Sequence, residues 1–138
     1  MRILEYYDRY LAGTLEAVFD RLFTVYCSCW LIIHIGRWCR RPVPFLNNWL
    51  TDFIFIPVIA HVALVVTRHF IIRSTAYRYP ISYLLFAAFY VSFFYEYLFP
   101  HYHFHTVGDP FDVIAYFGGS LFYFFVHQRL AFGLFSGN

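Results

Sequence analysis

The chain has 138 residues, of which 61% are hydrophobic and 13% are charged. A soluble domain of this size cannot bury that much apolar surface, so the composition excludes an ordinary soluble protein and predicts a single all-α membrane domain over residues 1–138. The formal net charge of +2 is carried by arginine without lysine. It leaves no basic surface for nucleic acid, so we expect the lipid bilayer to be the main partner.

Residues 1–21 form the first predicted element, an amphipathic helix. Leu4, Tyr7, Leu11 and Leu15 recur at helical spacing, and most charged side chains fall on other faces. Such a helix lies on the membrane surface or leads into the first span. Residues 22–36 are the first predicted span, although this segment is shorter than the roughly 20 apolar residues that a perpendicular span needs.

Three further spans are predicted, over residues 49–67, 80–99 and 111–126. Pro57 lies inside the second span, where it frees the carbonyl of Phe53 and is expected to kink the helix. In the fourth span, Gly118, Gly119 and Ser120 form a small-residue surface that lets a neighbouring helix approach closely. We therefore expect an integral membrane bundle of about four transmembrane helices.

The distribution of arginine predicts the orientation. With four spans, one side holds both termini and Arg2, Arg9, Arg21, Arg68, Arg73, Arg78 and Arg129, and the other side holds Arg37, Arg40 and Arg41. Because the more positive side stays in the cytoplasm, both termini are predicted to be cytoplasmic. The three outer arginines run against this rule, and a three-span arrangement with residues 22–36 only embedded would place the N-terminus outside.

Four carboxylates lie at span ends on the predicted outer face. Asp52 begins the second span, Glu96 ends the third, and Asp109 and Asp112 begin the fourth, with Asn48 nearby. Ionisable groups near the hydrocarbon are costly unless they are paired or hydrated, so each is a candidate for function. Converging carboxylates favour a hard divalent cation such as Mg²⁺ or Ca²⁺, which takes oxygen ligands.

Each of these acids also has a structural explanation. Asp109 fits a helix N-cap, with Pro110 at the first helical position and Asp112 at the third. Asp52 and Glu96 have no local capping role, but they could neutralise the outer arginines. The candidate ion-pair partners are Arg37, Arg40 and Arg41.

Histidines form a second group of candidates. His101, His103 and His105 alternate in the loop after the third span, and they would share one side, and so bind a transition metal, only in an extended segment. A plain loop at the aqueous boundary is the alternative. His61, in the middle of the second span, is expected to hydrogen-bond to a neighbouring helix rather than to relay protons. His127, at the end of the fourth span, has no evident partner.

Catalytic motifs of soluble enzymes are absent. The sequence has no nucleophile elbow, phosphate loop, HExxH, Cys-x-x-Cys or dinucleotide fingerprint. We therefore expect no soluble-type catalysis. An intramembrane enzyme that acts on lipid remains a minor alternative, because paired carboxylates can perform acid–base chemistry.

The order of these motifs resembles two groups of bacterial membrane proteins. Residues 42–127 resemble small bacterial multi-span proteins that are labelled automatically as magnesium citrate secondary transporters, through the segments 44–52, 95–100 and 109–113. The second half is similar to the VanZ-like family, in which a Glu near the end of one span precedes an acid-x-x-Asp start to the next and then a Gly. Glu96, Asp109, Asp112 and Gly118 match that pattern, although the Gln and Arg usual in the family are absent.

The resemblance implies a small cell-envelope protein of the bacterial inner membrane, linked to glycopeptide tolerance or cell-surface lipid chemistry. Our leading hypothesis is a non-enzymatic protein that binds a divalent cation or a polar headgroup at the four carboxylates. A second hypothesis is a transporter or transporter subunit for a metal–organic acid complex, which needs a homo-oligomer or a membrane partner protein and uses the outer arginines for the anion. A third is a structural partner bundle in which the acids only pair with those arginines.

Overall fold

The computed structural model describes residues 12–41, 44, 49–74, 76–102 and 109–135. Within these ranges the chain is all-helical, as the composition predicts, and contains no strand. The elements are a short helix (Ala12–Val18), α2 (Arg21–Trp38), α3 (Thr51–Val66) with the π-helical turn η2 (Thr67–Ile71), α4 (Ile81–Ser92) with η3 (Phe93–Leu98) and α5 (Phe99–Tyr102), and α6 (Pro110–Phe122) with η4 (Tyr123–His127) and α7 (Gln128–Phe135).

Two of the predicted spans are confirmed as helices that are long and apolar enough to cross a membrane. They are Thr51–Ile71 and Ile81–Leu98, and the pair Ala12–Val18 and Arg21–Trp38 makes a third if the two helices, bent by 64°, count as one span. Residues 110–127 are helical but are not among these candidates, so four spans are not confirmed. Apolar side chains nevertheless point outward along the bundle, with Ile32 68%, Phe86 67% and Ile114 65% exposed, as lipid contact requires.

The N-terminal segment differs from the predicted continuous helix over residues 1–21. Residues 1–11 lie outside the described part of the chain, and the helix Ala12–Val18 ends before Asp20. Asp20 has an extended backbone and accepts a hydrogen bond from the N–H of Phe23 at 2.8 Å, so it is the N-cap of α2. The helix that follows has 18 residues and ends at Trp38, which makes it longer than the predicted segment 22–36.

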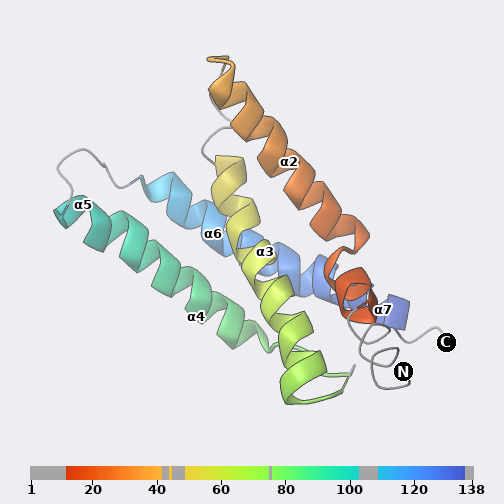
Figure 1. Cartoon of the computed structure of the whole chain (residues 1–138). Helices are drawn as coiled ribbons and strands as arrows, with labels where there is room; N and C mark the ends of the chain where they lie inside the picture. The colour runs from red at the N-terminus through yellow and green to blue at the C-terminus, as the bar shows by residue number, and fades with distance from the viewer. Residues whose placement is uncertain (1–11, 42–43, 45–48, 75, 103–108, 136–138) are drawn as a thin grey trace.

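The long helices alternate in direction along the chain (Figure 1). The end of α2, the start of α3, the short helix α5 and the start of α6 lie toward one end of the bundle, and α7 and the short helix Ala12–Val18 lie toward the other. As a result α3 and α6 run side by side in the same direction. A buried cluster of Ile56, Ala88 and Tyr116 joins α3, α4 and α6.

The backbones of α3 and α6 approach each other closely at Gly119. A Cβ atom added to Gly119 would overlap the carbonyl oxygen of Phe53 and lie 3.1 Å from the Cδ atom of Pro57. Pro57 has no N–H, so the Phe53 carbonyl lacks its usual helical partner and instead faces the backbone of α6. The predicted small-residue surface on the fourth helix is therefore confirmed. A glycine is needed at position 119 because Pro57 leaves the Phe53 carbonyl directed at the backbone of α6.

Two polar contacts attach α4 and the segment before it to this part of the chain. The Ser120 hydroxyl donates to the carbonyl of Leu84 at 3.1 Å and so attaches α6 to α4. At the other end, the Gln128 amide donates to the carbonyl of Tyr79 at 3.0 Å and accepts from its N–H at 3.1 Å. Tyr79 lies in the segment that precedes α4, so the Gln128 amide fixes the α3–α4 connection against η4 and α7.

We expect Gly119→Ala to destabilise the protein strongly and Gly118→Ala to be tolerated. The new methyl group at position 119 has to displace backbone, and such overpacking costs about 1–3 kcal/mol. At position 118 it meets only the ring of Phe53 at 3.5 Å, an ordinary contact. Thermal unfolding of both variants in detergent measures the difference, and equal melting temperatures would contradict the assigned contact.

Candidate functional site

The four predicted acidic site residues lie at one end of the bundle, where α3, α4 with η3, and α6 meet. Asp52, in the first turn of α3, accepts a hydrogen bond from the hydroxyl of Tyr116 in α6 at 3.1 Å. The carboxylates of Asp52 and Asp112 lie close enough to interact electrostatically. One oxygen of Asp112, Oδ1, is buried without a hydrogen-bond partner. Two half-buried carboxylates therefore face each other across the α3–α6 contact.

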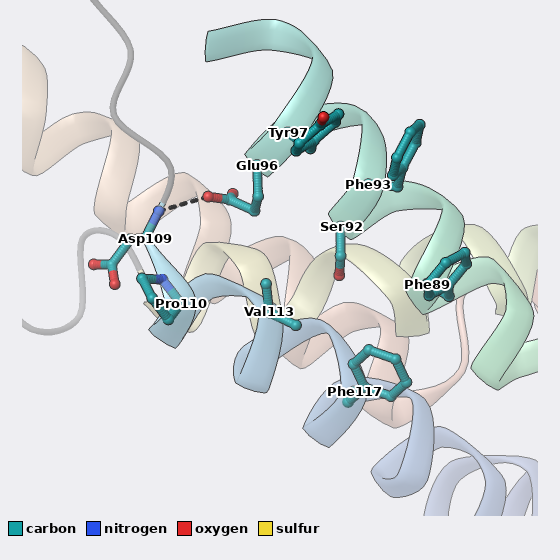
Figure 2. A pocket seen from close by; sticks show the side chains of 9 residues that line it. All are labelled: Phe89, Ser92, Phe93, Glu96, Tyr97, Asp109, Pro110, Val113 and Phe117. Atoms are coloured by element: carbon teal, nitrogen blue, oxygen red, sulfur yellow. Dashed lines mark hydrogen bonds between the residues drawn. The ribbon is translucent and has the colours of Figure 1, made fainter. Parts of the chain in front are cut away.

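Glu96 forms a separate contact with the start of α6. Its Oε2 atom accepts a hydrogen bond from the backbone N–H of Asp109 at 2.6 Å (Figure 2). The Asp109 carboxylate itself points away from Glu96 and accepts from the N–H of Phe111 at 3.0 Å. Asp109 is thus the N-cap of α6, with Pro110 next to it, as the sequence predicts. The four acids form two pairs, Asp52 with Asp112 and Glu96 with Asp109, and not one compact ligand set.

A pocket of about 410 Å³ lies between the end of α4 with η3 and the start of α6. Its lining is mostly apolar and aromatic, with the polar groups gathered at Ser92, Glu96 and Asp109. Figure 2 shows Glu96 at the end of the pocket near the start of α6, and Phe89 and Phe117 at the other end. The complete lining is Phe89, Ser92, Phe93, Glu96, Tyr97, Asp109, Pro110, Val113 and Phe117.

Ser92 is the unusual residue of this pocket. It is only 7% exposed, and its hydroxyl oxygen is buried without a hydrogen-bond partner. In Figure 2 the Ser92 side chain points from the end of α4 toward α6, between Glu96 and Phe89. A buried hydroxyl without a partner costs free energy, and a hydrogen bond at this position would recover part of that cost.

The arginines that the sequence predicts as ion-pair partners of the acids lie at the end of α2. Arg40 and Arg41 are exposed at the end of α2, where Arg40 takes a left-handed backbone (φ 54°) and the N–H of Arg41 donates to the Gly36 carbonyl. Among the described residues, the ion pairs that involve a carboxylate join Asp20 to His61 and His127, and the four acids make their described contacts with Tyr116 and with the start of α6. The pairing of the acids with the outer arginines stays a prediction.

Several predicted site residues cannot be placed. Asn48, His103 and His105 lie outside the described residues, so the proposed amide ligand and the alternating histidine motif stay predictions. His101 is exposed at the end of α5.

Sequence analysis missed a second polar cluster, at the opposite end of the α3–α6 pair. The side chains of Asp20, His61 and His127 come together there, and their ligand atoms all lie within 4.8 Å of one another. Their positions are 41 and 66 residues apart along the chain, so no local motif could reveal the cluster. The available signal was two buried histidines without partners, together with an acid at a helix start.

Comparisons with protein-family models, with curated proteins and with solved structures were made for the whole chain. No match was found. The site is therefore interpreted from its own geometry.

Proposed function

We propose that this chain is a small membrane protein that binds a lipid-like amphiphile in the pocket between α4 and α6. The headgroup would meet Glu96, and the apolar part would lie along Phe89, Val113 and Phe117. The observation that carries the proposal is the buried hydroxyl of Ser92, which lacks a partner inside a pocket that is otherwise apolar apart from its acidic end.

The polar end of the pocket favours a headgroup that donates hydrogen bonds. Glu96 supplies a carboxylate and Asp109 supplies a second negative charge nearby. A carboxylate accepts and does not donate, so an anionic headgroup would be repelled and an ammonium or hydroxyl group would be bound. Ser92 can then donate or accept at the junction between headgroup and chain.

The apolar end suits an acyl or prenyl chain. Phe89 is 60% exposed and Phe93 is 45% exposed beside the pocket, so this face is apolar toward its surroundings. Pockets for organic ligands are typically apolar with a few placed polar groups, which describes this lining. Because the pocket is formed by the end of a membrane-spanning helix, its ligand would come from the bilayer.

We expect the purified protein to retain phosphatidylethanolamine, which carries an ammonium group, in preference to phosphatidylglycerol, which does not. Native mass spectrometry after exchange into mixed lipids measures this preference. Glu96→Gln should reduce it about tenfold, because a hydrogen bond to a charged group contributes roughly 1.5–3 kcal/mol. Ser92→Ala should weaken retention of both lipids, and Glu16→Gln, at an exposed position, is the matched control. An equal preference in wild type and Glu96→Gln would contradict the proposal.

A second candidate function, binding of a divalent cation, is favoured by the pair Asp52 and Asp112. Two facing carboxylates repel each other unless they share a proton or hold a cation. The unpartnered Asp112 Oδ1 and the fixed Asp52, held by Tyr116, offer oxygen ligands of the kind that Mg²⁺ and Ca²⁺ prefer. This cation site and the amphiphile pocket lie at the same end of the bundle, so one molecule could contain both a lipid and its counter-ion.

We expect Mg²⁺ or Ca²⁺ to raise the melting temperature of the wild-type protein and to have no such effect on Asp112→Asn. Without added cation, Asp112→Asn should melt at a higher temperature than wild type, because it removes the repulsion between the carboxylates. Glu96→Gln changes the other acidic pair, so this variant should still melt at a higher temperature when the cation is added. A cation response that survives in Asp112→Asn would contradict this second function.

We further propose that the protein lies in the bacterial inner membrane with several passes and with both termini in the cytoplasm, and that it belongs to the VanZ-like group of envelope proteins. The arginine distribution supports this orientation. Arg68 lies in η2, and Arg73 and Arg78 lie in the connection between η2 and α4. Arg129 lies in α7, at the same end of the bundle. The acidic site would then face the outside of the cell.

A further inference from the structure

The cluster of Asp20, His61 and His127 is formed by three separate parts of the chain. Asp20 is the N-cap of α2, His61 lies in the middle of α3, and His127 ends η4. Both histidines are buried, at 1% and 0% exposure, while the Asp20 side chain is 11% exposed. Ionisable groups are costly inside a membrane protein and mark functional positions unless they are fully paired.

The ligand atoms of the cluster lie close to one another. The Nε2 atom of His127 lies 2.7 Å from Asp20 Oδ2, and the Nε2 atom of His61 lies 3.7 Å from the same oxygen. A tetrahedral ion with bonds of about 2.0–2.1 Å needs ligand atoms roughly 3.3 Å apart. The two distances to Asp20 bracket that value, and all of the ligand atoms lie within 4.8 Å of one another. The two imidazole rings are stacked with their centroids 4.3 Å apart and their planes at 21°, so the rings would have to turn for both nitrogens to point at one ion.

We infer that Asp20, His61 and His127 form a binding site for a divalent transition metal ion such as Zn²⁺. Two imidazole nitrogens and one carboxylate are a common ligand set for Zn²⁺ and Fe²⁺, and they leave at least one coordination position open. Mg²⁺ and Ca²⁺ prefer oxygen ligands, so this site differs in chemistry from the acidic pair at the other end of the bundle.

The surroundings of His127 match those of a metal ligand. Its second ring nitrogen, Nδ1, is 3.1 Å from the hydroxyl of Tyr26, and the two groups share a hydrogen bond. Metal-binding histidines usually have such a partner on the nitrogen that does not bind the metal, and it fixes the orientation of the ring. When the metal takes Nε2, the ring proton moves to Nδ1 and is donated to Tyr26.

His61 would change its hydrogen bonding on binding the ion. Its Nε2 atom lies 3.1 Å from the carbonyl oxygens of Ala17 and Val18, which can only accept, so this nitrogen carries the proton. Ligation through Nε2 would replace these two contacts and move the ring proton to Nδ1, which has no hydrogen-bond partner among the described residues.

The test is the binding of Zn²⁺ to the purified full-length protein in which Cys27, Cys29 and Cys39 are replaced by Ser, so that no thiol competes. Competition with a chromogenic chelator should show a single tightly bound equivalent. His61→Gln and His127→Gln should lose it, and Tyr26→Phe should weaken it roughly tenfold or more. His34→Gln is the matched control: this half-buried histidine contacts Trp30 in its own helix, lies outside the cluster and should leave binding unchanged when replaced.

A measurement on the unsubstituted histidines keeps the inference testable if these variants fail to fold. Co²⁺ bound at the site should give the visible absorption bands of four-coordinate nitrogen and oxygen ligation, and Zn²⁺ should raise the melting temperature. A variant with His101, His103 and His105 all replaced by Gln should retain both signals, which separates this site from the loop histidines. Absence of both signals, or their loss only in that triple variant, would overturn the inference.

Discussion

The rest of the structure depends on the close contact between α3 and α6. Gly119 admits the Phe53 carbonyl to the backbone of α6, and Pro57 leaves that carbonyl without a helical partner. This contact sets the register between two parallel helices. One register places Asp52 beside Tyr116 at one end and His61 beside Tyr123 and His127 at the other. A shift of one turn would separate both sets, so a single packing constraint governs both polar clusters.

The two ends of this helix pair present different chemistry. At the end with α5, carboxylates and one buried serine meet an aromatic pocket, which is a combination suited to an amphiphile and to hard cations. At the end with α7, imidazoles join a carboxylate and favour a softer metal ion. The outer surface between them exposes large apolar side chains, which is compatible with residence in a membrane. A metal at the second cluster would hold α2 against α3 and η4.

Local physics made much of the fold predictable. Hydropathy located α3 and α4 to within a few residues, and the helix-start chemistry of Asp109, Pro110 and Asp112 is confirmed. The Pro57 and glycine signals indicated a close helix contact, but not which helices made it. The cluster of Asp20, His61 and His127 could not be predicted, because its members come together only through the α3–α6 register and the break before α2. For the same reason the sequence grouped four acids that the structure divides into two pairs.

The most direct test of the account is the side of the membrane on which each helix end lies. In a cysteine-free background, single cysteines at positions 40, 101 and 76 are treated with a membrane-impermeant thiol reagent in intact cells. The account predicts that Arg40→Cys and His101→Cys are labelled from outside and that Ala76→Cys is labelled only after the cells are opened. Labelling of positions 40 and 101 from opposite sides would separate the ends of α2 and α4, and it would contradict a shared acidic face.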